Sequence, residues 1–186
     1  MVRIDRVVTR GGDRGETSLG DGERVAKDAP RVEAMGAVDE ANAAIGVLRL
    51  HVGGDGEADA MLARIQNDLF DVGADLCVPG TGADRLRLTE AVVARLEAEV
   101  ASVNAALPQL TSFVLPGGTA AAAQAHLART IVRRAERRVV ALSHVESVNP
   151  EVIRYLNRLS DHLFVLGRRC NASGTGDVLW VPGANR

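Results

Sequence analysis

Five arginines and one glutamate lie within RTIVRRAERR, positions 129–138, in a segment otherwise rich in alanine and valine. With about 100° between successive residues of an α-helix, Arg129, Arg133 and Glu136 share a stripe beside an apolar one, and Arg137 lies slightly off it. Arg129 and Arg133 are like charges one turn apart, an unfavourable spacing in a helix. A guanidinium pairs bidentately with phosphate oxygens, so the stripe predicts an anionic partner, with phosphate a good match.

The N-terminal stretch from residue 9 to residue 27 carries the groups of a phosphate cradle. Glycine amides can approach an anion closely, and hydroxyls and cations can complete the contacts. No GK[ST] follows the glycines, so this is not a Walker A loop. Taken by itself, the stretch is better explained as a flexible surface loop; together with the arginine stripe it favours a polyphosphate ligand. The groups are Thr9, Arg10, Gly11, Gly12, Gly15, Thr17, Ser18 and Lys27.

Polar residues also follow the apolar stripes of two other predicted helices. Asp39 and Asn42 are three apart and share a face. Beside the apolar stripe of the last helix lie Arg154, Asn157, Asp161 and Arg168. Polar strips of this kind indicate either a shared polar cleft or a subunit interface. Solvated faces with incidental spacing remain an alternative.

Groups for acid, base or nucleophilic catalysis are scarce. The sequence has no GxSxG and no paired Cys and His, and Cys77 and Cys170 are expected to be free thiols. The histidines have no metal-ligand spacing and are expected to be structural or on the surface. They are His51, His126, His144 and His162.

Five segments of helical periodicity must position these groups. They run from about 32 to 50, 57 to 77, 89 to 106, 119 to 143 and 150 to 171, with Thr89 and Asn149 as caps and Pro150 at a first helical position. We expect an all-α, five-helix up-down bundle with an irregular N-terminal loop. A single domain over 1–186 would comprise that loop (1–30), the bundle (31–171) and a tail (172–186).

Composition limits the partners. A net charge of −2 and 3% aromatic residues argue against nucleic acid, and no apolar run is long enough to cross a bilayer. The N-terminus shows no signal peptide, so a cytoplasmic location is expected.

Six blocks, in order, resemble the PduO-type ATP:corrinoid adenosyltransferases. They are TRGGDRGETSL…GERVAKD, RVEAMGAVDEANAAIG, RIQNDLFDVGADL, FVLPGG, RTIVRRAERRVV and VIRYLNRLSDHLFVLGR. The resemblance implies a ferritin-like bundle of the cobalamin adenosyltransferase type, a homotrimer with active sites at its subunit interfaces. It implies transfer of the 5′-deoxyadenosyl group of ATP, with Mg²⁺ held mainly by the phosphates, to the cobalt of cob(I)alamin, releasing triphosphate.

The resemblance also assigns roles to residues. It implies that Arg129 pairs with Asp39 of a neighbouring subunit and that Phe113 packs under the corrin. A cobalamin reductase and an adenosylcobalamin-dependent mutase become expected partners. Val8, Gly11 and Ala26 depart from the family's pattern in the loop. The ATP site implied by the resemblance comprises Thr9, Arg10, Gly11, Gly12, Thr17, Ser18, Lys27, Arg133, Arg134, Ala135, Glu136, Arg137 and Asn157.

Two other functions remain open at the level of sequence. A nucleotide- and cobalamin-binding protein without turnover, which delivers adenosylcobalamin to a partner enzyme, would use the same residues. A structural helical oligomer would use the arginines for salt bridges between subunits. Catalysis and product delivery can also coexist in one protein.

Overall fold

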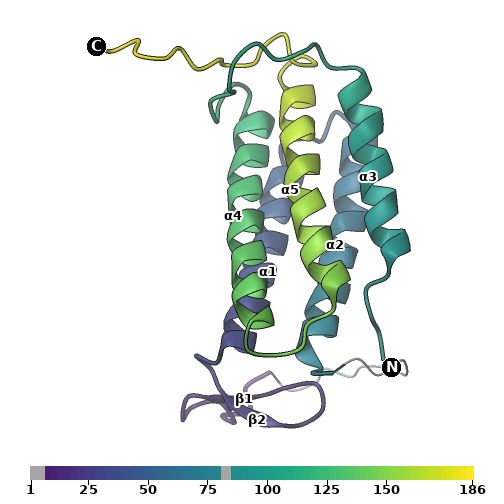
Figure 1. Cartoon of the computed structure of the whole chain (residues 1–186), viewed down its shortest axis with the longest axis vertical. Helices are drawn as coiled ribbons and strands as arrows, with labels where there is room; N and C mark the ends of the chain where they lie inside the picture. Colours follow the sequence, from purple (N-terminus) through teal and green to yellow (C-terminus); the bar gives the residue numbers. More distant parts are fainter. Residues whose placement is uncertain (1–6, 81–84) are drawn as a thin grey trace.

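The five expected helices form an up-down bundle in a computed structural model that describes residues 7–80 and 85–186 (Figure 1). Each helix runs antiparallel to the one before it, and the bundle is all-α apart from one small hairpin. Every expected helix boundary falls within two residues of the observed one. The helices are α1 (Pro30–Arg49), α2 (Gly56–Cys77), α3 (Glu90–Ala105), α4 (Ala120–Ser143) and α5 (Pro150–Cys170).

Side-chain caps explain where two of the helices begin. The Thr119 hydroxyl accepts from the Ala122 amide at 3.1 Å, and the Asn149 side chain accepts from the Glu151 amide at 3.1 Å. Pro150 then occupies the first helical position, where its missing N–H is not needed. The expectation for Thr89 is only half right: it stands at the N-cap position of α3, but its side chain makes no capping hydrogen bond.

Small residues let α4 pack closely in the bundle, where it lies against both α1 and α5. Ala122, Ala125, Ala128 and Ala135 of α4 are fully buried. A Cβ added at Gly167 of α5 would lie 3.4 Å from the Ala125 Cβ, so only a small residue fits this crossing. The tight packing holds the polar sides of α4 in fixed positions beside its two neighbours.

The N-terminal segment is not wholly irregular, contrary to expectation. Strands β1 (Glu16–Ser18) and β2 (Arg24–Ala26) form an antiparallel hairpin with Thr17 opposite Val25. Three-residue strands are too short for alternating hydrophobicity to reveal them. The Gly20 amide donates to the Cys77 carbonyl at 2.9 Å, which ties the hairpin to the end of α2 (Figure 1).

The C-terminal tail leaves the opposite end of the bundle (Figure 1). Its base is held by Arg168, whose Nε donates to Asp177 at 2.7 Å; both side chains are buried. The tail then pairs with the segment before α4: the Leu115 amide donates to the Val178 carbonyl, and the Trp180 amide to the Phe113 carbonyl. The expectation that Arg168 lines an open polar strip is therefore wrong, because it serves as this buried anchor.

Among the described residues, no helix is long and apolar enough to cross a membrane.

Candidate active site

The arginines of α4 form two sets that face different neighbours. On the side of α1, Arg134 hydrogen-bonds to Glu40, and the Arg138 Nε lies 3.8 Å from a Glu33 carboxylate oxygen. The other set is Arg129, Arg133 and Arg137. None of these three has a carboxylate partner within residues 7–80 and 85–186.

Two members of the second set, Arg133 and Arg137, line a pocket between α4 and α5. Arg133, Glu136, Arg137 and Val140 of α4 and Asn157 of α5 line a cavity of about 300 Å³. The Asn157 Nδ2 donates to the Glu136 carboxylate at 2.9 Å. The structure thus brings together four residues of the predicted ATP site. Two of them are cations, one is a carboxylate and one is an amide.

Arg158 supports this pocket, although no motif or spacing in the sequence singled it out. Its Nη1 donates to the Asn157 Oδ1 at 2.7 Å, and its Nε donates to Glu97 at 2.8 Å. The Asn157 amide is therefore fixed on both sides, with its oxygen toward Arg158 and its nitrogen toward Glu136.

Arg129 is half-buried one turn away from this pocket. Its Nε is buried and has no hydrogen-bond partner in the described part of the chain. Burial lowers the pKa of Arg129, and the neighbouring Arg133 lowers it further. A guanidinium stays protonated in spite of such shifts, so Arg129 carries a positive charge that these residues do not balance.

The hairpin end of the molecule holds a second polar pocket. Lys27 lines it together with Arg134, Arg138 and the α1 glutamates Glu33 and Glu40, around a volume of about 320 Å³. Lys27 and Arg134, both predicted ATP contacts, therefore meet here and not in the pocket between α4 and α5.

The glycine loop packs against this lysine. A Cβ at Gly12 would lie 2.8 Å from the Lys27 Nζ, so glycine allows the side chain to lie across the loop. Arg24, which sequence reasoning missed, donates to the Gly11 carbonyl at 2.8 Å and to the Ser18 hydroxyl at 3.3 Å. The loop is therefore organised by its own hairpin. Thr9 and Arg10 are exposed at its surface.

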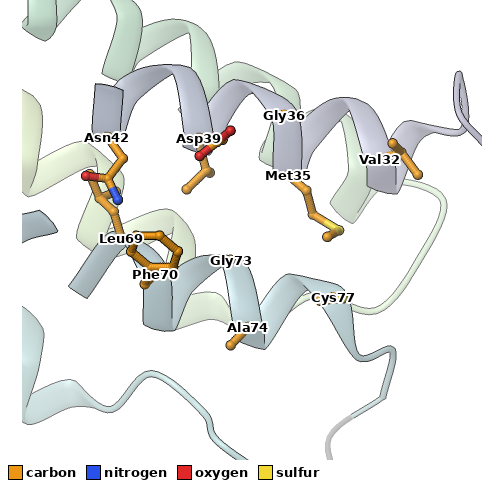
Figure 2. Close-up of a pocket in the computed structure, with 11 residues that line it drawn as sticks. Val32, Met35, Gly36, Asp39, Asn42, Leu69, Phe70, Gly73, Ala74 and Cys77 are labelled. Atoms are coloured by element: carbon orange, nitrogen blue, oxygen red, sulfur yellow. The ribbon is translucent and has the colours of Figure 1, made fainter. Parts of the chain in front are cut away.

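Asp39 and Asn42 line a different site, a groove of about 520 Å³ between α1 and α2 (Figure 2). The Asn42 Nδ2 donates to the Gln66 carbonyl, but its buried Oδ1 has no partner in the described chain. Asp39 is exposed, and Phe70 across the groove is 72% exposed. Sequence reasoning missed this groove, because Phe70 looks like any other apolar residue of an amphipathic helix.

Phe113 lies in the segment before α4 and is 76% exposed. Its ring centroid is 6.0 Å from that of Trp180, with the planes inclined at 53°. The tail thus places a second aromatic ring beside the predicted corrin-packing residue.

The predicted site residues therefore do not share one cleft within a single chain. They occupy the hairpin end, the pocket between α4 and α5, the groove between α1 and α2, and the Phe113 loop. Ala135 is fully buried in the core, which leaves its side chain no surface for a ligand. Of the three interpretations of the polar strips, a cleft shared by all three helices does not form within one chain, because their residues line separate pockets. The subunit interface and solvated faces remain predictions.

The amino-acid sequence is similar to those of proteins whose activity is known. The chain is 49% identical over 179 residues to a cobalamin adenosyltransferase of Cupriavidus metallidurans, covering 96% of this chain and 95% of the relative. It is 47% identical over 190 residues to the corrinoid adenosyltransferase of Mycobacterium tuberculosis, covering 100% and 97%.

Solved structures agree in fold. A phenylalanine-to-histidine variant of the PduO-type ATP:corrinoid adenosyltransferase of Lactobacillus reuteri, complexed with cobalamin and ATP, matches at TM-score 0.89 and 34% identity, covering 95% of this chain and 97% of that one. An arginine-to-lysine variant complexed with ATP matches at TM-score 0.84 and 36% identity, covering 94% and 100%. The family model for cobalamin adenosyltransferase matches residues 7–170, and this chain belongs to that family.

Proposed function

We propose that this chain transfers the 5′-deoxyadenosyl group of ATP to the cobalt of cob(I)alamin, forming adenosylcobalamin and triphosphate. The observation that carries the proposal is the unbalanced arginine set of Arg129, Arg133 and Arg137, beside a polar pocket that holds Glu136 and Asn157. Family membership, and the ATP and cobalamin in the related structures, support the same reading.

The chain's task in this reaction is alignment and charge stabilisation. The Co(I) electron pair attacks C5′, the Co–C5′ bond forms as the C5′–O bond breaks, and triphosphate leaves with the bonding pair. No protein base or nucleophile is needed, because the corrinoid supplies the nucleophile. Arg133 would stabilise the charge that grows on the departing triphosphate, with Arg137 assisting at the edge of the pocket.

Mg²⁺ enters as part of the substrate MgATP. The described residues contain no cluster of three or more metal-ligating side chains, and Glu136 is the only carboxylate in the pocket between α4 and α5. A cation held mainly by phosphate oxygens fits this donor set better than one caged by protein.

Two copies of the chain would complete each site. Arg129 lies on the side of α4 near α5, whereas Asp39 lies at the groove between α1 and α2, so a contact between them would join two different surfaces of the chain. Joining unlike surfaces is a heterologous contact, and such contacts form a closed ring when the rotation between neighbouring subunits closes. The predicted homotrimer is a ring of this kind. It would bring the Asp39 groove of one subunit against the arginines of the next.

Phe113 would act on the corrin. An apolar ring on the lower face of the cobalt excludes water and leaves a four-coordinate centre, which is easier to reduce to Co(I). Phe113 is exposed and contacts Trp180, so the two aromatic rings together would offer the corrin an apolar surface. A reductase that supplies the electron, a mutase that receives the product and a cytoplasmic location remain predictions.

Anaerobic turnover tests the proposed function. The protein is mixed with MgATP and chemically reduced cob(I)alamin, and the absorbance of adenosylcobalamin is followed. We expect product with the unaltered chain. No product, with ATP still raising the melting temperature, would leave a binding protein, and no effect of ATP at all would leave a structural bundle.

A further inference from the structure

The segment that carries Phe113 runs through residues 108–119, between α3 and α4. It is part of neither a helix nor the hairpin, so its backbone groups must find their hydrogen-bond partners elsewhere. The Phe113 ring itself is 76% exposed and has little packing to hold it. The position of this ring therefore depends on the groups that bind the backbone around it.

The C-terminal tail binds the backbone at Phe113 itself. The Trp180 amide donates to the Phe113 carbonyl at 2.8 Å, and the Ser112 hydroxyl donates to the Trp180 carbonyl at 2.7 Å. This antiparallel pairing sets Phe113 opposite Trp180, with 6.0 Å between their ring centroids. The ring is thus held against the tail, and it stays in place only if the tail does.

Asn171, the C-cap residue of α5, binds the far end of the segment. Its side chain is buried, its Oδ1 accepts from the Thr119 amide at 2.9 Å, and its Nδ2 donates to the Gly117 carbonyl at 3.2 Å. Gly118, between these two partners, has a φ of 97°, and a Cβ at this position would overlap the Asn171 carboxamide. Glycine thus lets the segment wrap around the asparagine side chain.

Asn171 also fixes the turn from which the tail starts. Its carbonyl accepts from the Gly174 amide at 3.1 Å and from the Gly176 amide at 2.9 Å. Ala172 and Ser173, just after it, have φ values of 50° and 52°, an unfavourable conformation that persists where the surroundings fix it. One residue therefore holds both the segment before α4 and the start of the tail.

Arg168, one turn earlier on α5, holds the other end of the segment. Its buried guanidinium donates to the Pro108 carbonyl at 2.7 Å and to Asp177 at the base of the tail, also at 2.7 Å. Hydrogen bonds from a charged group are stronger than those between neutral groups. The last turn of α5 thus binds the start of the segment, its end and the tail that pairs with its middle.

We propose that Asn171 is a positioning residue that, together with Arg168, holds the Phe113 ring where it covers the lower face of the cobalt. The proposal rests on the proposed function, in which Phe113 excludes water from the metal. A loop that only joined α3 to α4 would not need an exposed aromatic ring held by buried polar groups. Releasing the segment should therefore impair the reduction of cob(II)alamin more than the transfer of the adenosyl group to cob(I)alamin.

The ratio of two rates measures this selectively. One rate is product formation from cob(II)alamin and a reductant, and the other is product formation from chemically reduced cob(I)alamin. Asn171→Leu is close in volume but loses both side-chain hydrogen bonds, and we expect it to lower the ratio by about 3- to 10-fold. Gly118→Ala displaces the same side chain from the opposite direction and should lower the ratio similarly, so the test does not depend on one variant folding. The increase in melting temperature on adding MgATP should remain in both.

The matched control is Asn149→Leu, at the N-cap of the same helix. The Asn149 Nδ2 donates to Asp75 at 2.7 Å and to the Leu88 carbonyl at 2.9 Å, away from the Phe113 segment. This variant should lower the melting temperature and leave the ratio unchanged. An unchanged ratio in Asn171→Leu and Gly118→Ala would overturn the proposal, and so would an equal fall in Asn149→Leu.

A double variant shows whether Asn171 acts through Phe113. In a Phe113→Ala background, Asn171→Leu should lower the ratio no further, because the ring that it positions is already gone. Losses that multiply in the double variant would contradict the proposal. Absence of product from cob(I)alamin in the unaltered chain would instead contradict the proposed function, so the two failures are distinguishable.

Discussion

The two sides of α4 carry the same residue type in different electrostatic states. Toward α1, Arg134 and Arg138 meet the glutamates Glu40 and Glu33, so their charge is balanced within the chain. On the other side, Arg129 and Arg133 meet no carboxylate among the described residues, and burial and mutual repulsion lower the pKa of Arg129. Arginines that a chain leaves unbalanced are the stronger candidates for binding an anion, whereas the charge of balanced ones is already met by the fold. The number of arginines alone does not separate these roles.

Removing an unbalanced arginine should have the largest effect. We expect Arg133→Ala to lower turnover by about 100- to 1,000-fold, since it removes the main cation facing the leaving triphosphate. The increase in melting temperature on adding MgATP should shrink with it. Arg138→Ala on the balanced side is the control, and a comparable loss in that variant would contradict the division into two sides.

The helices could be predicted from the sequence because their signals are local. Asn149 and Pro150 mark the start of the last helix through signals that lie within one turn, and the structure places them there. The division of the arginines was also partly visible, because the helical angle separates Arg134 and Arg138 from Arg129. Their glutamate partners on α1 were not, since pairing between helices depends on how the bundle packs.

The rest of the candidate site depends on contacts between distant segments. The buried Arg168–Asp177 pair and the pairing of Trp180 with Phe113 join the tail to α5 and to the segment before α4, and no periodicity predicts them. The hydrogen bonds from Asn171 to the segment before α4 likewise become visible only once its surroundings are known. The division of the chain into loop, bundle and tail stays a prediction, and residues 1–6 of that loop lie outside the described residues.

The second-largest effect should be on the assembly of subunits, and it should follow from removing the Asp39 carboxylate. Removing one partner of a buried ion pair typically destabilises by about 3–5 kcal/mol, so Asp39→Ala should weaken the predicted trimer if Arg129 of a neighbour covers it. Sedimentation velocity at decreasing protein concentration measures the dissociation. The double variant Asp39→Arg with Arg129→Asp should restore part of the assembly. Unchanged sedimentation and activity in Asp39→Ala would argue against this interface.

Phe113 tests the other end of the molecule. Phe113→Ala should bind ATP normally and turn over chemically reduced cob(I)alamin, but from cob(II)alamin and a reductant we expect a loss of about tenfold or more, equivalent to roughly 1.4 kcal/mol. The physical reason is that water regains access to the lower face of the cobalt. Phe113→Leu, which keeps apolar bulk, should lose less. A rate from cob(II)alamin equal to that of the unaltered chain would remove this role from Phe113.

The smallest effect should come from Glu40, which stands next to Asp39 in the sequence. Glu40 and its partner Arg134 are both about half exposed, and ion pairs of this kind contribute about 0–1 kcal/mol. Glu40→Ala should therefore shift the free energy of unfolding by no more than about 1 kcal/mol and leave sedimentation unchanged. The adjacent substitution Asp39→Ala removes the same charge from the same turn of α1. If both variants dissociated the assembly equally, net charge on α1 would be the cause, and the contrast between the two sides of α4 would fail. A difference between them would show that the position of the carboxylate, and not the net charge on α1, determines whether the assembly holds together.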